Sequence, residues 1–171
     1  KEIYEKAQLD EKKYNELFKF CVEKKINFFS SVFNIEGAKT LLNVHNDIVK
    51  IPSMESRNEA LLKFCNKNFK KILISTGTST EEEIIQTKKF VDQDKAVYLH
   101  CVSSYPCNVE DANLPRINFM KKLSKEYGFS DHTIGIEISK LSFEYNINFL
   151  EKHYTVDQSL PGRDNKFAIL P

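Results

Sequence analysis

The chain alternates between short apolar runs and amphipathic segments, and this alternation restricts its fold more than any other feature. One run, Ile72-Leu-Ile74, is apolar at every position instead of at every second one. A continuously apolar strand is typical of a parallel sheet that is buried on both faces. The pattern therefore predicts an α/β protein with a parallel sheet. Six strands are expected, over residues 26–33, 47–51, 71–76, 96–102, 128–130 and 147–151.

The segments between these strands carry helix signals. Residues 10–25 place apolar side chains at helical spacing, and their first residue, an aspartate, is a suitable N-cap. A capping box, formed by Ser79 with Glu82 or by Thr80 with Glu83, predicts the start of a second helix. Further helices are expected near residues 35–45, 57–67, 116–126 and 136–146.

The parallel sheet could be open or closed into a barrel. The chain contains no Gly-x-Gly-x-x-Gly after its first expected strand and no phosphate-binding loop with Gly-Lys-Ser, so the usual nucleotide-binding open sheets lose their support. A parallel (β/α)8 TIM barrel typically needs about 250 residues, which leaves room here for roughly six βα units. The sequence therefore predicts a partial TIM barrel.

Charge and cysteine content exclude several classes of protein. The formal net charge is +1, and basic residues alternate with acidic ones, so we expect no nucleic-acid partner. No apolar run approaches the roughly eighteen residues of a membrane span, so we expect no membrane association. The four cysteines lack the paired spacing of a zinc site, which favours reduced thiols in the cytoplasm.

Hydroxyl side chains recur where the expected strands end. In a TIM barrel, the carboxyl ends of the strands carry the chemistry. Several hydroxyls with one nearby cation, Lys50, would suit a phosphate group. The alternative is that each serine caps the helix that follows it. The hydroxyls in question belong to Ser30, Ser31, Ser53, Ser75, Thr76, Ser103, Ser104 and Ser130.

Two histidines also stand just past strand-like runs, with acidic residues nearby. His132 follows Asp131, and His153 follows Glu151 by two positions. Imidazole is a common ligand of divalent transition metals, and two such ligands leave coordination positions for water and substrate. The alternative is two unrelated histidines, each satisfied locally.

Six ordered motifs together resemble the N-acetylneuraminate (sialic acid) synthase family. The resemblance runs over essentially the whole chain, and no single motif would carry it. The motifs are Lys50-Ile-Pro-Ser-Met-Glu55 with Asn58, Ile74-Ser-Thr-Gly77, Leu99-His-Cys101 with Tyr105-Pro106, Gly128-Phe-Ser-Asp-His-Thr133, Glu151-Lys-His153 and Pro161-Gly-Arg-Asp-Asn165.

The resemblance implies an enzyme that condenses phosphoenolpyruvate with N-acetylmannosamine or a related N-acylated hexosamine and releases phosphate. The family includes synthases of neuraminic, legionaminic and pseudaminic acids. Members of the family have two further barrel strands before this region and a small antifreeze-like domain after it. Residues 1–171 are thus expected to be a central part of the catalytic barrel, inactive by itself, from a cytoplasmic enzyme that forms a homodimer at full length.

The same resemblance assigns roles to individual residues. His132 and His153 would hold Mn²⁺ or Mg²⁺. Glu55 and Asp164 are implied to lie near the reacting sugar and metal as catalytic groups, and Tyr105 to contact substrate. On the sequence alone, each of these residues has a simpler interpretation. Glu55 would be a carboxylate at a helix N-terminus, Asp164 a turn residue and Tyr105 part of an aromatic wall. The implied phosphoenolpyruvate pocket comprises Ser31, Lys50, Ser53, Ser75, Ser103 and Ser130.

Two alternative functions stay open on the sequence alone. The chain could be a non-catalytic or incomplete barrel that binds phosphate or metal without turnover. It could also be another TIM-barrel aldolase or lyase that uses Lys50 as a Schiff base.

Overall fold

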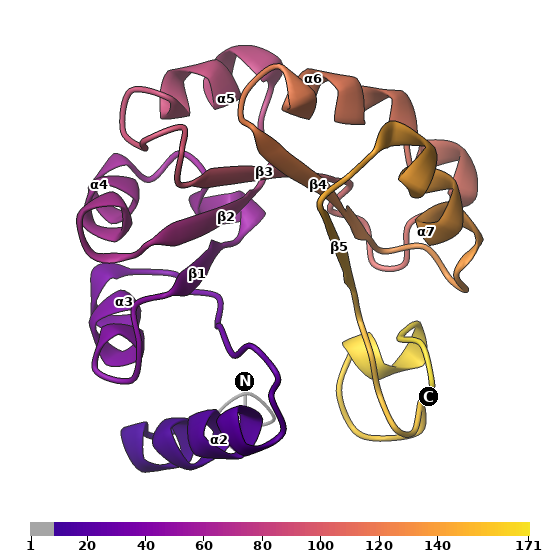
Figure 1. Ribbon diagram of the computed structural model, residues 1–171. Coiled ribbons are helices and arrows are strands. Elements are labelled where there is room, and N and C mark those ends of the chain that lie inside the picture. The colour runs from indigo at the N-terminus through magenta and orange to yellow at the C-terminus, as the bar shows by residue number, and fades with distance from the viewer. Residues whose placement is uncertain (1–8) are drawn as a thin grey trace.

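The computed structural model describes residues 9–171. Five strands form one parallel sheet in the order β1-β2-β3-β4-β5, which is also their order along the chain. Figure 1 shows this sheet curling into an arc with helices along its outer side. Sequential order and continuous curvature are typical of part of a barrel wall. The strands are β1 (Ile48–Ile51), β2 (Lys71–Ser75), β3 (Ala96–Cys101), β4 (Glu126–Asp131) and β5 (Phe149–Lys152).

Most of the longer helices begin at a residue whose side chain caps them. Asp10, Asn34 and Asn58 each accept a hydrogen bond from a backbone N–H in the first helical turn. Thr80 and Glu83 form the reciprocal capping box, so the second of the two predicted pairs is the correct one. The helices are α2 (Glu11–Glu23), α3 (Ile35–Leu42), α4 (Glu59–Asn68), α5 (Glu81–Thr87), α6 (Ile117–Lys121) and α7 (Glu137–Ser142).

The central strands are buried on both faces, as the continuous apolar runs predicted. On the outer face, Ile72, Ile74 and Tyr98 belong to the main core, which the helices cover. On the inner face, Leu73, Val97 and Leu99 form a second apolar cluster. Burying an aliphatic side chain of this size contributes about 1.5–3 kcal/mol relative to exposure. The two clusters together explain why alternation is absent from these strands.

The prediction of a strand over residues 26–33 is wrong. Only an isolated bridge between Ser31 and Lys50 forms there, closed by hydrogen bonds from Val32 N to Lys50 O and from Lys50 N to Ser30 O. Ile26 and Phe33 are 60% and 52% exposed, so most of this apolar run does not enter the core. A strand requires a ladder of consecutive backbone partners, and hydrophobicity alone does not supply one. The sheet consequently has five strands instead of the expected six.

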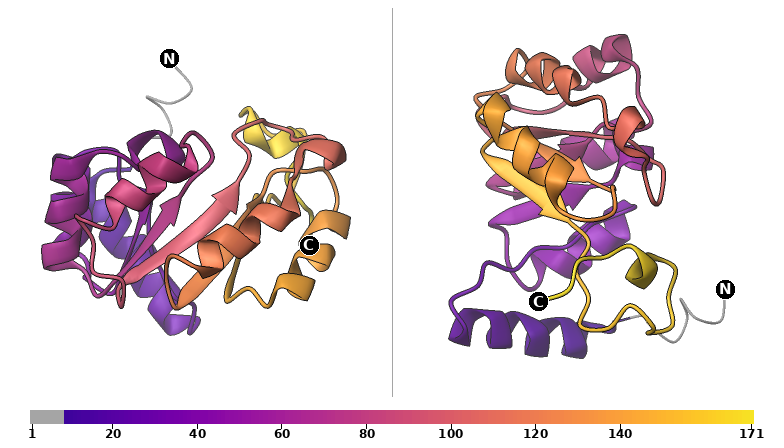
Figure 2. Two further views of the ribbon diagram at one scale, coloured as in Figure 1. Left: turned by 90° about the horizontal axis from the view of Figure 1, so that it is seen from above. Right: turned by 90° about the vertical axis from the view of Figure 1, so that its right-hand side faces the viewer.

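Other differences concern the ends of elements. The helix expected over residues 116–126 is shorter in the structure, where α6 ends at Lys121 and β4 begins at Glu126. Helix α2 forms where predicted, but none of its side chains is buried. Figure 1 and the right-hand view of Figure 2 place α2 and the C-terminal segment beneath the arc. The ring of Phe18 in α2 stacks on His45, which follows α3. No helix within residues 9–171 is long and apolar enough to cross a membrane.

Candidate active site

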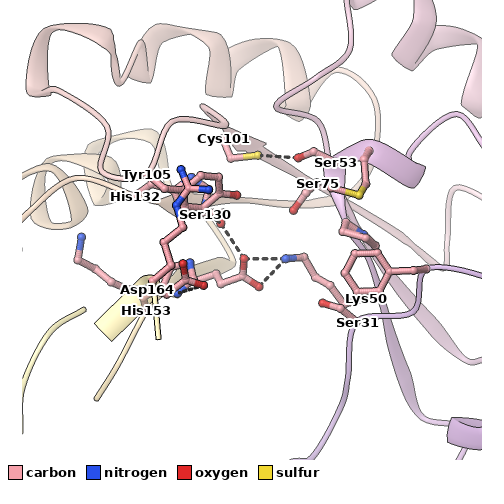
Figure 3. A pocket seen from close by; sticks show the side chains of 16 residues that line it. Ser31, Lys50, Ser53, Ser75, Cys101, Tyr105, Ser130, His132, His153 and Asp164 are labelled. Atoms are coloured by element: carbon pink, nitrogen blue, oxygen red, sulfur yellow. Dashed lines mark hydrogen bonds and ion pairs between the residues drawn. The ribbon is translucent and has the colours of Figure 1, made fainter. Parts of the chain in front are cut away.

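An open pocket of about 690 Å³ lies at the carboxyl ends of the strands. All five strands are parallel, so their carboxyl ends meet at one edge of the sheet. Figure 3 shows the side chains from β1 and β2 on one side of the pocket and those from β4 and β5 facing them. The pocket is lined by Ser31, Phe33, Lys50, Pro52, Ser53, Met54, Ser75, Cys101, Tyr105, Ser130, His132, Glu151, Lys152, His153, Arg163 and Asp164.

Lys50 is the cation on the β1 side of the pocket. Its backbone is fixed twice, by the pairing of β1 with β2 and by the bridge to Ser31. Its side chain is only 8% exposed, and its Nζ lies 2.6 and 2.7 Å from the two carboxylate oxygens of Glu151. Strands β1 and β5, at the two ends of the sheet, are thereby joined across the pocket. The curvature of the sheet makes this contact possible.

Glu151 also accepts a hydrogen bond from Ser130. The Ser130 hydroxyl lies 2.7 Å from Glu151 Oε1. Burial by itself would raise the pKa of Glu151, but the charge of Lys50 and the hydrogen bonds from Lys50 and Ser130 outweigh burial and hold it below its usual value. Glu151 is therefore ionised at neutral pH, and the charge of Lys50 is compensated within the pocket.

The two histidines lie side by side, as expected from their strand ends. The ring centroids of His132 and His153 are 5.6 Å apart. Tyr105 packs on both rings, at 4.2 Å from His132 and 5.9 Å from His153, and Phe167 lies 5.1 Å from His153. The aromatic contacts limit how far the imidazoles can turn.

The donor set of the histidines fits a divalent cation in part. His132 Nδ1 lies 2.6 Å from Val102 O, and because a carbonyl only accepts, Nδ1 carries the proton and Nε2 keeps its lone pair. Burial lowers the pKa of His132, which favours the neutral, metal-binding form. His153 Nδ1 lies 3.8 Å from Asp164. No cluster of three or more His, Cys, Asp or Glu side chains suited to a metal occurs among residues 9–171.

The structure brings together most, but not all, of the predicted site residues. Asp164 and Tyr105 line the pocket, as do both histidines. Glu55 does not: its Oε2 accepts a hydrogen bond from Asn58, the residue that caps α4. Ser103 follows β3 but is exposed and lies outside the lining. Of the six predicted phosphate-pocket residues, the five that line the pocket are Ser31, Lys50, Ser53, Ser75 and Ser130.

The hydroxyl of Ser53 contacts the loop after β2 as well as the pocket. Its hydroxyl accepts the backbone N–H of Gly77 at 3.0 Å and lies 3.3 Å from Cys101 Sγ. A Cβ on Gly77 would lie 2.5 Å from Ser103 Oγ and 2.8 Å from Cys101 Sγ, so only glycine lets these loops approach. Ser53 therefore holds the loop after β2 against the end of β1 while its hydroxyl faces the pocket.

Sequence reasoning missed Glu151 as a site residue, although it named the residue as a strand end. The available signal was the two-residue spacing to His153, because alternate residues of a strand share a face. Lys152 and Arg163 also line the pocket without having been assigned a role.

The chain is similar to nonulosonic acid synthases over nearly its whole length. It is 31% identical to the pseudaminic acid synthase of Campylobacter jejuni over 172 residues, which cover 98% of this chain and 50% of that protein. It is 33% identical to the N,N'-diacetyllegionaminic acid synthase of the same species over 176 residues, which cover 99% of this chain and 53% of the relative. The chain thus spans about half the length of these relatives.

The fold of the chain also matches those of solved structures. The crystal structure of N-acetylneuraminic acid (sialic acid) synthetase from Leptospira borgpetersenii superposes with a TM-score of 0.89 at 34% identity, over 96% of this chain and 59% of that one. A truncated 3-deoxy-D-arabino-heptulosonate 7-phosphate synthase from Thermotoga maritima matches with a TM-score of 0.80 at 13% identity, which supports the fold alone. The NeuB family model matches residues 1–171, so the chain belongs to the NeuB family.

Proposed function

We propose that this chain forms the central wall of a (β/α)8 barrel that condenses phosphoenolpyruvate with an N-acylated hexosamine to give a nonulosonic acid and phosphate. The observation that carries the proposal is one pocket in which Lys50, four serine hydroxyls and two imidazoles meet at the carboxyl ends of the strands. Pseudaminic and legionaminic acid synthases among the relatives support the product class.

The residues divide into an anion side and a cation side. Lys50 and the hydroxyls of Ser31, Ser53, Ser75 and Ser130 would bind the phosphate of phosphoenolpyruvate through charge and short hydrogen bonds. His132, through Nε2, and His153 would hold Mn²⁺ or Mg²⁺, with the Asp164 carboxylate 3.8 Å from His153 Nδ1. A divalent cation bound there would polarise the carbonyl oxygen of the sugar aldehyde.

The chemistry requires one carbon–carbon bond to form and one carbon–oxygen bond to break. The vinyl carbon of phosphoenolpyruvate attacks the aldehyde carbon of the sugar, water adds to the resulting cation-like carbon, and phosphate leaves with its bridging oxygen. Two carboxylates line the pocket, Glu151 and Asp164. Glu151 is bonded to Lys50, so Asp164 would accept the proton of the attacking water. Glu55 would act only from outside the lining, so we assign it to the start of α4 instead of to the reaction.

Calorimetry of the full-length protein tests the binding part of the proposal. Wild type should bind phosphoenolpyruvate and Mn²⁺, and a His132→Ala, His153→Ala double variant should lose Mn²⁺. His45→Ala is the matched control, because His45 packs against Phe18 and Phe28 away from the pocket. Lys50→Gln should lose phosphoenolpyruvate, whereas Lys63→Gln, on the exposed face of α4, should not.

Phosphate release on addition of N-acetylmannosamine, or of its legionaminic or pseudaminic precursors, tests the catalytic part. Binding of both ligands without phosphate release from any of these sugars would favour the non-catalytic alternative. If wild type binds neither ligand, the proposed function is wrong.

A further inference from the structure

The carboxylate of Glu151 lies where the proposed function places an anion. It accepts hydrogen bonds from Lys50 at 2.6 and 2.7 Å and from Ser130 at 2.7 Å. These two side chains are donors that the phosphate of phosphoenolpyruvate would use. A phosphate group approaching Lys50 therefore meets a negatively charged oxygen within hydrogen-bonding distance of the same ammonium group.

The competition cannot be relieved by Lys50 alone. The Lys50 side chain is 8% exposed, so it has little freedom to turn from Glu151 toward a ligand in solvent. The next pocket cation, Lys152, is itself paired with Asp131 at 2.8 Å and is 7% exposed. Glu151 has more room to turn, because 36% of its side chain is exposed and it lines the pocket.

The side of the pocket toward which Glu151 can turn carries the two histidines. Ser130 lies on β4 and Glu151 on β5, and His132 and His153 are the first residues after these two strands. All four side chains line the pocket. Ser130 Oγ lies 3.3 Å from His132 Nε2 while it donates to Glu151. One hydroxyl therefore separates the carboxylate from the nitrogen that keeps its lone pair. A cation held by these imidazoles would attract the carboxylate.

We propose that Glu151 couples the two ligands: an anion takes Lys50 from Glu151, a divalent cation compensates the charge that Glu151 is left with, and each ligand strengthens binding of the other. The inference rests on the proposed function. Without a cation, the Glu151 carboxylate stays bonded to Lys50 and weakens the binding of phosphoenolpyruvate. Because coupling between two sites is reciprocal, phosphoenolpyruvate must raise Mn²⁺ affinity by the same factor by which Mn²⁺ raises phosphoenolpyruvate affinity.

The test is calorimetric titration of phosphoenolpyruvate into the full-length protein with and without saturating Mn²⁺. In wild type we expect Mn²⁺ to tighten phosphoenolpyruvate binding by about tenfold, within the usual range of coupling between sites. Glu151→Gln keeps the size of the side chain and can still bond Ser130, but it removes the charge. This variant should bind phosphoenolpyruvate about tenfold more tightly than wild type in the absence of Mn²⁺ and should show much less coupling.

Glu126→Gln is the matched control. Glu126 pairs with Lys71 at 2.6 Å, and both are the first residues of their strands, at the sheet edge opposite the pocket. The same chemical change there should leave both affinities unaltered. Glu151→Asp, which keeps the charge, should retain coupling. Equal phosphoenolpyruvate affinity of Glu151→Gln and wild type without Mn²⁺ overturns the role of Glu151 while the proposed function stands. Absence of coupling in wild type overturns it even without a folded variant, and failure of wild type to bind either ligand overturns both.

Discussion

Asp131 and Lys152 form a buried ion pair that joins the ends of β4 and β5 directly beside the two histidines. Lys152 Nζ lies 2.8 Å from Asp131 Oδ2 and 2.7 Å from Thr133 O, and the two side chains are 7% and 0% exposed. The residues are register partners in the sheet. Burial by itself raises the pKa of Asp131, but hydrogen bonds from Lys152, Ser139 and Thr133 outweigh it and hold the pKa below its usual value.

Removing one partner of this pair should be costly. We expect Asp131→Asn to lower the free energy of unfolding by about 3–5 kcal/mol, because Lys152 would remain buried without its counter-charge. The comparison is Asp47→Asn in the Asp47–Lys70 pair, which is 62% and 70% exposed and should cost no more than about 1 kcal/mol. Urea unfolding measures both, and equal losses would show that burial does not govern the pair.

His100 should make the fold sensitive to acid. Its side chain is 1% exposed, its Nε2 lies 2.8 Å from Ala112 O, and burial lowers its pKa to about 4. The unfolded value is about 6.5, so the unfolded chain binds the proton more readily, and stability is complete above pH 6.5 and falls as the pH drops toward 4. A separation of about 2.5 pH units corresponds to about 3 kcal/mol.

Thermal unfolding from pH 7 to pH 4 measures this loss. Carboxylates also contribute in this range, so the contribution of His100 is the difference between wild type and His100→Gln, which carries no titrating ring. Identical pH dependence of the two proteins would contradict the assignment.

Two glycine-to-alanine changes should have opposite effects. A Cβ on Gly128 would lie 2.2 Å from Phe149 O and 2.7 Å from Leu99 Cδ2, so Gly128→Ala must force β4 and β5 apart. We expect a loss of about 1–3 kcal/mol, as for other overpacked sites. Gly37 lies within α3 and its Cβ would meet only Asn34 Oδ1 at 3.4 Å, so Gly37→Ala should stabilise by up to about 1 kcal/mol. Chemical denaturation of the two variants checks both signs.

Borohydride should not trap substrate on Lys50. A Schiff-base lysine reacts as a neutral amine, whereas Lys50 is bonded to both oxygens of the Glu151 carboxylate. Treatment with borohydride in the presence of pyruvate or the sugar aldehyde should leave the mass of the peptide that contains Lys50 unchanged. A covalent adduct on Lys50 would instead support the aldolase alternative.

Much of the fold follows from local sequence. Continuous apolar runs such as Ile72-Leu-Ile74 predict parallel strands buried on both faces, and caps such as Asp10 and Thr80 predict where helices begin. Both signals act within a few residues, so they can be read without knowing the fold. Residues 26–33 show the limit, because an apolar run becomes a strand only where a neighbouring strand offers consecutive hydrogen-bond partners.

By itself, the sequence determined the parallel sheet, the order of its five strands and which residues stand at the ends of those five, because parallel strands place their carboxyl ends at one edge. It did not determine the structure of residues 26–33. Only the tertiary structure decided that Lys50 meets Glu151 across 101 positions of the chain and that Glu55 lies outside the pocket. Such contacts depend on the curvature of the whole sheet and on where each loop turns. No local pattern encodes those distances.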